Sequence, residues 1–387
     1  MTFGRGLRKY SLQPFLASTT LAGEGKAIRH FNTPVTRFCY GPFVANRALG
    51  APHLPSSDSP AKSRLALAER AEASPLAGIG TSRVADTVFQ GAMLACGLSV
   101  LALVGLIIYQ LITKSSLSWH AFGWKFFFAS EWDPVNDQFG AWPFIYGTLV
   151  SSAVALALAV PLAIGVAVFI TEMSPRWLRA PLAFTTELLA AIPSVIYGLW
   201  AIFVLVPLLR QYVEPFLGRY LGWTGFFSGT PYGIGMLAAG VILAIMVVPI
   251  ISAITREVMT AVPQQQREAV LALGATRWEM IRTGVLRNAR AGILGGVILG
   301  LGRALGETMA VTMVIGNRPE IAKSLFAPGY TMASVIANEF SEATGDTYLS
   351  ALVEVGLALF IVTIIVNILA QVLVWSVTRG MPARSST

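Results

Sequence analysis

The sequence predicts an all-α polytopic membrane protein with about six transmembrane helices. Hydrophobic residues make up 55% of the 387 residues and charged residues only 12%, whereas soluble domains carry roughly 25% charge. The net charge of +8 comes mostly from basic residues that flank apolar segments, which favours a topological signal over nucleic-acid binding. The two cysteines and three histidines lack ligand spacing, so we expect no disulfide framework, no metal and no cofactor.

Residues 1–85 form an N-terminal arm without a sustained apolar period. From Met1 to Ser57 the arm holds seven basic residues and one acidic residue, Glu24. Three interpretations stay open: a disordered cytoplasmic arm, a targeting-like leader, or translated sequence upstream of the true start. An apolar segment near the start, which a signal peptide needs, is missing. We expect disorder and assign the arm no function.

The remaining chain divides into long apolar segments, each able to cross a hydrocarbon core, which takes about 20 helical residues. Five windows contain no acidic or basic residue: 87–113, 138–171, 188–209, 220–255 and 355–378. The expected spans are 88–112, 146–171, 182–209, 233–255, 291–316 and 349–377. Residues 86–145 would then hold the first span and an extracytoplasmic segment, and 146–378 the transmembrane domain proper.

The basic residues of the connecting loops favour a topology with both termini in the cytoplasm. In that orientation the inner loops hold ten basic residues and the outer loops six. We therefore expect a multi-pass protein of the cell's inner or plasma membrane, with membrane lipid as its solvent.

The loop at 260–290, called the elbow below, has an unusually clear local pattern. Pro263 fits a first helical position, where its missing N–H costs nothing, and Gly274 fits a left-handed cap at the end of that helix. Thr276 and Glu279 then form a capping box that opens a second helix. Such an elbow suits docking into a groove on a partner, or it is a rigid connector on the membrane surface. The residues alone do not separate the two.

Four ionisable residues fall inside the expected spans, where charge is costly: Glu187, Arg303, Glu307 and Glu354. Arg303 lies about twelve residues into the fifth span, and Glu307 follows four residues later, so both would share one helix face. Either the two form an ion pair that holds the helix, or the guanidinium contacts a passing anion while Glu307 tempers its charge. Glu187 would pair with Arg303 or, as we favour, reach the cytoplasmic interface, and Glu354 would face an outer vestibule.

Within the elbow, Glu268-Ala269-Val270 followed by Gly274 resembles the EAA loop of ABC-importer permeases. In that family the first helix of the loop fits a cleft on a cytoplasmic ATPase and transmits its closure to the pore. The resemblance therefore implies ATPase coupling through Glu268, Ala269 and Gly274.

The end of the elbow departs from the usual family pattern. Leu286 matches it, whereas Gly284 and Arg287 do not. The departure weakens a match to sugar and amino-acid permeases and leaves the elbow itself unaffected.

Several further segments resemble phosphate-specific permeases of the PstC type. They are Trp132–Leu149, Ala191–Phe203, Gly300–Asn317 and Thr331–Phe340. In that family an arginine and a glutamate of the fifth span are implicated in phosphate passage, and they match Arg303 and Glu307. The resemblance implies a type I ABC importer permease fold over about 86–378.

The resemblance also implies the assembly: a heterodimer with a sister permease, two cytoplasmic ABC ATPase subunits and an extracytoplasmic phosphate-binding protein. The chain has no glycine-rich nucleotide loop of the P-loop type, so we expect a transport subunit of a phosphate importer and not an enzyme. Three alternatives remain open. They are an ABC permease for another oxyanion such as sulfate or molybdate, an ion-coupled secondary carrier, and a membrane scaffold or sensor.

Overall fold

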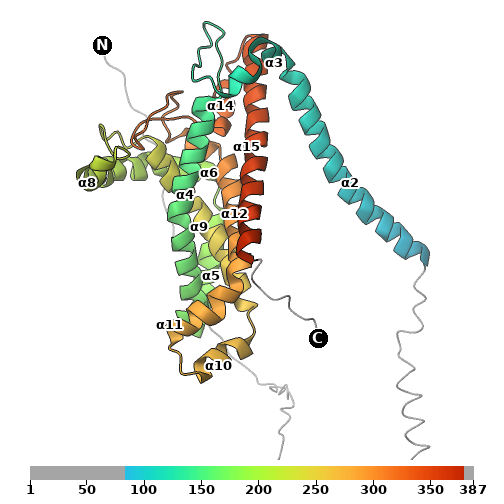
Figure 1. Ribbon diagram of the computed structural model, residues 1–387, viewed down its shortest axis with the longest axis vertical. Coiled ribbons are helices and arrows are strands. Elements are labelled where there is room, and N and C mark those ends of the chain that lie inside the picture. Colours follow the sequence, from blue (N-terminus) through green and yellow to red (C-terminus); the bar gives the residue numbers. More distant parts are fainter. Residues whose placement is uncertain (1–82, 379–387) are drawn as a thin grey trace, which may run out of the picture. The chain divides into compact units, whose positions relative to one another are not determined.

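The computed structural model describes residues 83–378, and side chains from 86 to 376. The chain divides into units Met1–Thr81 and Ser82–Thr387; only the second contains described residues, so the expectation for the N-terminal arm lies outside them. The described part is mostly helical (Figure 1) and contains six helices long and apolar enough to cross a membrane. The spans are Asp86–Lys114, Trp142–Met173, Ser194–Thr224, Met236–Thr260, Arg277–Gly306 and Asp346–Ser376. The expected all-α fold with six spans is confirmed.

The first span, α2 (Arg83–Lys114), is apolar around its whole circumference. No residue of its most apolar window is buried, and Figure 1 shows the helix diverging from the others. Its end is tied to the last span through Ser350, whose hydroxyl donates to the Lys114 carbonyl (2.9 Å) and accepts from the Ser118 amide (3.0 Å). Ser118 belongs to the short helix α3 (Ser116–Phe122).

Helices α4 (Trp142–Val168) and α9 (Met236–Thr260) form the centre of the bundle. Ala159 and Ala163 of α4 are fully buried in one apolar cluster with Val247 and Ile251 of α9. Small side chains at such a contact let two helices approach closely, which drives association when lipid removes the hydrophobic effect between them. Helix α12 (Arg287–Gly306) and the last span, α15 (Asp346–Thr378), pack alongside.

The third span differs from the expected 182–209. Helix α5 (Arg176–Ala191) ends inside that range, and Ile192 and Pro193 are extended. Helix α6 (Ser194–Trp200) then opens the third span, which continues to Thr224. The prediction was wrong because it ran through Pro193, which has no amide hydrogen and disfavours the helical conformation of the residue before it. The Tyr197 hydroxyl bridges the break by donating to the Leu189 carbonyl (2.7 Å).

The fifth span also differs from the expected 291–316. Its helix begins at Arg277, passes through a π-helical stretch at Met280–Leu286, continues as α12 and ends at Gly306. Glu307 is extended (φ −72°, ψ 130°), and a short helix, α13 (Met309–Thr312), follows. Glycine weakens a helix by about 0.5–1 kcal/mol relative to alanine. The last residue of α12 is the glycine Gly306, which favours a helix end at this position.

Candidate coupling elbow and translocation cavity

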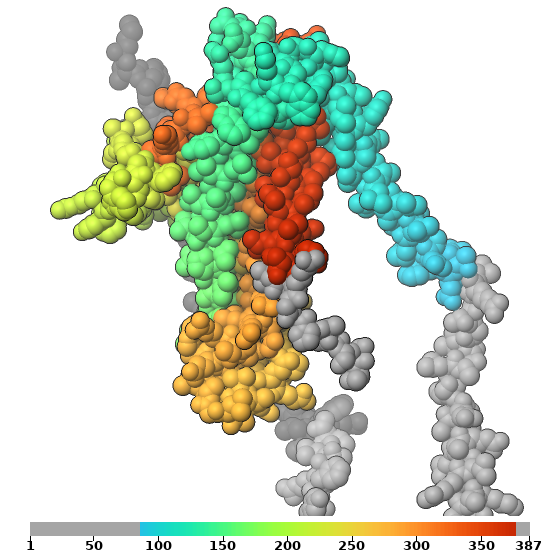
Figure 2. All heavy atoms as spheres, in the orientation of Figure 1, coloured from blue at the N-terminus to red at the C-terminus, as the bar shows by residue number. Residues whose placement is uncertain are grey.

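The elbow protrudes beyond the ends of the spans (gold, Figure 2). Its first helix is α10 (Gln264–Ala272), which Pro263 precedes as the cap rather than as the first helical residue. Gly274 follows with φ +84°, in the left-handed region that was predicted for it. The predicted capping box is present: Glu279 Oε2 accepts from the Thr276 amide at 2.8 Å, and Thr276 Oγ1 accepts from the Glu279 amide at 3.3 Å.

The second helix of the elbow is not a separate element, which corrects the expected boundary at 290. Thr276 caps the helix that runs from Arg277 to Gly306. Arg303 lies in the last turn of that same helix. A displacement of the elbow can therefore reach Arg303 through continuous backbone hydrogen bonding.

An ion pair that the sequence reasoning missed anchors α10 to the bundle. Arg267 lies 3.2 Å from the carboxylate of Glu172, at the end of the second span. Its guanidinium also donates to the Met259 carbonyl, in the last turn of α9, at 2.8 Å. Both side chains of the pair are largely buried, with 18% and 8% of their surface exposed. The only sequence signal is that Glu172 directly follows a long window without charges.

Apolar packing gives α10 an inner and an outer face. Val270 packs on a buried cluster formed by the ends of α4 and α9 and the start of the fifth span. A Cβ at Gly284 would lie 3.3 Å from the Val270 side chain, so glycine there permits the close approach. Glu268 and Ala269 are exposed, and Leu273 is 88% exposed. Within the segment that resembles the EAA loop, Glu268 and Ala269 thus face away from the bundle, whereas Val270 faces it.

Arg303 lines a cavity of about 600 Å³ between α9, α12 and α15. Besides aliphatic and glycine residues, the cavity is lined by the amides of Asn367 and Gln371. The sequence analysis missed these two residues, although they interrupt an otherwise apolar window. Together the three side chains place hydrogen-bond donors around a space inside the membrane-spanning part, a chemistry that suits an oxyanion.

The glycines near Arg303 divide into two groups. A Cβ at Gly300 would collide with Val247 and Ile251 of α9, so that glycine serves helix packing. A Cβ at Gly302 or Gly306 would meet nothing within 4 Å. These two therefore leave space beside Arg303 instead of supporting a contact within the described chain.

The expectation that Arg303 and Glu307 share a helix face is wrong, and of the two alternatives for them the ion pair is not formed. Because the helix ends at Gly306, the two side chains do not share a helix face, and no ion pair joins them. The Glu307 carboxylate instead accepts from the Ala310 amide (3.4 Å) at the start of α13. The Arg303 guanidinium is thus not neutralised by a carboxylate of the described chain.

The structure also places the other two acids of the expected spans, Glu187 and Glu354. Glu187 forms an ion pair with Arg256 of α9 and not with Arg303, and it remains 57% exposed. Glu354 was expected to face a vestibule, but it is fully buried and has no ion-pair partner among residues 86–376. Within that range no three His, Cys, Asp or Glu side chains are grouped as metal ligands.

Six apolar spans, with one helix connecting an exposed elbow to an arginine-lined cavity, define a membrane transport permease. Residues 159–379 match the family described as "binding-protein-dependent transport system inner membrane component", and the chain belongs to this family. The chain is 47% identical to the phosphate transport system permease protein PstC of Mesorhizobium japonicum, over 74% of this chain and 89% of that protein. It is 44% identical to the PstC of Haemophilus influenzae, over 75% of this chain and 93% of that protein. A probable PstC of Methanocaldococcus jannaschii is 39% identical to the chain, over 64% of this chain and 80% of that protein.

Proposed function

We propose that the chain is the permease subunit of an ATP-driven phosphate importer and forms half of the translocation pore. The observation that carries the proposal is the helix from Arg277 to Gly306, which connects the elbow to Arg303. The phosphate assignment draws support from the relatives, which are named phosphate transport permeases and match most of their length.

In this proposal the chain works within a larger assembly. A sister permease completes the pore, two ABC ATPases dock on the two elbows, and a phosphate-binding protein delivers the substrate from outside. Both termini and the elbow lie in the cytoplasm, in agreement with the excess of basic residues in the inner loops. Glu268, Ala269 and the exposed Leu273 supply a mixed polar and apolar face for a groove on the ATPase.

The coupling route follows the contacts of α10. When the ATPases close, force on α10 passes through Arg267 to the ends of the second span and of α9, because that side chain contacts Glu172 and Met259. The same force passes through Val270 to the start of the fifth helix, and along that helix to Arg303. The bundle therefore responds at several helices at once.

Arg303 is the proposed phosphate contact. Its planar guanidinium can donate two parallel hydrogen bonds to an oxyanion, and Asn367 and Gln371 can add amide donors in the same cavity. Because Glu307 does not pair with it, the guanidinium remains available to the anion. Permeation needs binding that is favourable but not tight, and Glu307 lies just past the helix end, where its charge aids release.

Phosphate uptake by a strain that lacks its own phosphate permease tests the proposal. Arg303→Gln is expected to lower uptake at least tenfold, since charged hydrogen bonds contribute about 1.5–3 kcal/mol each. Membrane levels and copurification of the ATPase are expected to stay unchanged. Arg318→Gln, outside the spans, is the matched control. Normal uptake by the Arg303 variant refutes its role.

Competition experiments identify the cargo and the energy source. Excess sulfate or molybdate is expected to leave phosphate uptake unchanged, and strong competition by either reassigns the permease to that oxyanion. Uptake that survives loss of the partner ATPase but collapses with the ion gradient indicates a secondary carrier. No uptake at all, with an intact regulatory output, indicates a scaffold or sensor.

A further inference from the structure

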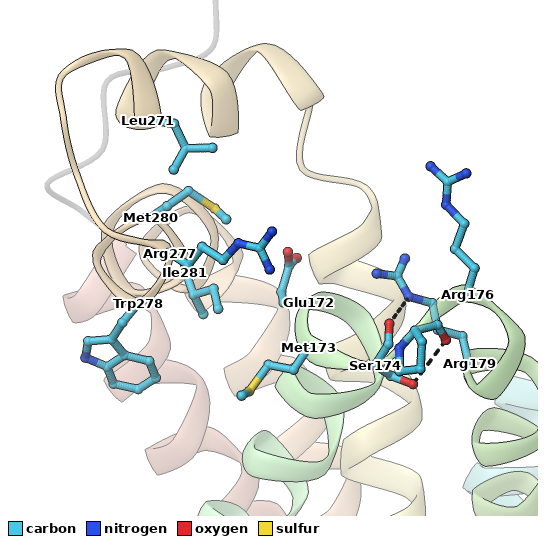
Figure 3. Close-up of a pocket in the computed structure, with 11 residues that line it drawn as sticks. Glu172, Met173, Ser174, Arg176, Arg179, Leu271, Arg277, Trp278, Met280 and Ile281 are labelled. Atoms are coloured by element: carbon cyan, nitrogen blue, oxygen red, sulfur yellow. Dashed lines mark hydrogen bonds between the residues drawn. The ribbon is translucent and has the colours of Figure 1, made fainter.

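A second cationic cavity lies at the elbow end of the bundle, away from Arg303. Its volume is about 690 Å³, and we call it the arginine pocket. Its lining includes Arg176, Arg179, Arg277, Met173, Trp278 and Ile281 (Figure 3). The second span ends at Met173 and the fifth begins at Arg277. Two spans thus place this pocket at the boundary between hydrocarbon and water.

The charges of the arginine pocket favour an anion. Three arginines line it against one acid, Glu172, and Glu172 is already paired with Arg267. Arg179 uses its Nε to donate to the Ser174 carbonyl (3.1 Å), whereas the side chains of Arg176 and Arg277 have no hydrogen bond or ion pair within residues 86–376. The 16-residue helix α5 begins at Arg176, so its positive dipole end adds to the field.

The other half of the lining is apolar and opens to the surroundings. Met173 is 65% exposed and Trp278 is 60% exposed, and in Figure 3 both side chains extend from the pocket on the side away from α10. Trp177, next to Arg176, is 75% exposed. Tryptophan is enriched where membrane and water meet, because its ring is apolar and its N–H is polar.

We propose that the arginine pocket binds the headgroup of an anionic phospholipid of the leaflet that faces the elbow. The phosphate contacts Arg176 and Arg277, and the acyl region runs along Met173 and Trp278. Basic pockets between helices at the membrane surface are suited to such headgroups. Inorganic phosphate shares the anionic chemistry, but it would leave the apolar half of the pocket unfilled. A bound lipid would connect the start of α5 to the elbow.

Native mass spectrometry of the full, detergent-purified chain tests this proposal with dioctanoyl phosphatidylglycerol, dioctanoyl phosphatidylcholine and inorganic phosphate as probes. One phosphatidylglycerol is expected to bind per chain, in preference to phosphatidylcholine. Arg176→Gln and Arg277→Gln are each expected to weaken its binding about fivefold, and the double variant roughly 30-fold. Arg282→Gln, an exposed arginine of the same helix outside the lining, is the control and is expected to change affinity less than twofold.

Several outcomes would overturn the proposal. Equal affinity for the two lipids removes the headgroup selectivity, and an equal loss in Arg282→Gln reduces the effect to general surface charge. Displacement of the lipid by inorganic phosphate at comparable concentration makes the pocket a free-anion site. Arg277→Lys, which keeps the charge, is expected to retain most of the affinity, and a loss as large as that in Arg277→Gln would show that the charge at this position does not attract the headgroup. None of these outcomes depends on phosphate transport.

Discussion

Gly274 offers a test of how the elbow is shaped, because its backbone requirement and its surroundings can be separated. The residue has φ +84°, and a Cβ added there would meet no atom within 4 Å. Substitution therefore causes conformational strain without a clash. The strain is about 1–2 kcal/mol for an ordinary L-residue. It is less for asparagine, which tolerates the left-handed region, and more for a β-branched side chain.

These costs predict an order of effects that does not follow size alone. Gly274→Asn is expected to behave nearly as the wild type, Gly274→Ala to be impaired and Gly274→Val to be worst. A strain of 1–2 kcal/mol lowers the ratio of native to open elbow by about 5–30-fold. The readout is phosphate transported per ATP hydrolysed in reconstituted vesicles, together with hydrogen exchange of the α10 amides. If asparagine impairs coupling as much as valine does, backbone strain is not the cause, and Gly274 instead contacts a partner directly.

Three other predictions concern the interior of the bundle. Gly147→Ala is expected to lower thermal stability by the equivalent of about 1–3 kcal/mol, since its Cβ would collide with a backbone oxygen. Gly165→Ala in the same helix has open space and is expected to be neutral or slightly stabilising; equal effects would refute the packing argument. Arg267→Met is expected to lower the free energy of unfolding by about 2–3 kcal/mol, a loss between those of exposed and buried ion pairs. When Glu172→Gln is already present, the same substitution is expected to cost less. If the two losses add fully in thermal unfolding, the two side chains do not interact. Glu354→Gln is expected to change the free energy of unfolding by less than about 1 kcal/mol, because the charge of an isolated buried carboxylate does not stabilise the fold. Strong destabilisation would mean that Glu354 has a partner outside the described residues.

The turn chemistry of the elbow could be predicted because it is local. A capping box depends on two side chains three residues apart, and a left-handed cap depends on the absence of a Cβ at one position. Thr276, Glu279 and Gly274 therefore behave as their sequence pattern indicates. The start of the third span after Pro193 and the helix end at Gly306 were missed because an apolar window shows only that a segment can enter lipid. It does not show that the helix is continuous.

The sequence by itself determined that the chain lies in a membrane, the number of spans and the turns of the elbow. Each of these follows from composition or from residues within about one helical turn of each other. The resemblance to phosphate permeases added Arg303 as a candidate. Only the tertiary structure decided what surrounds Arg303: it forms no ion pair with Glu307 and shares a cavity with Asn367 and Gln371. It also revealed that Arg267 pairs with Glu172, some 95 positions earlier. Such partners depend on how helices cross, and helix crossing is set by packing among many residues and not by any local pattern.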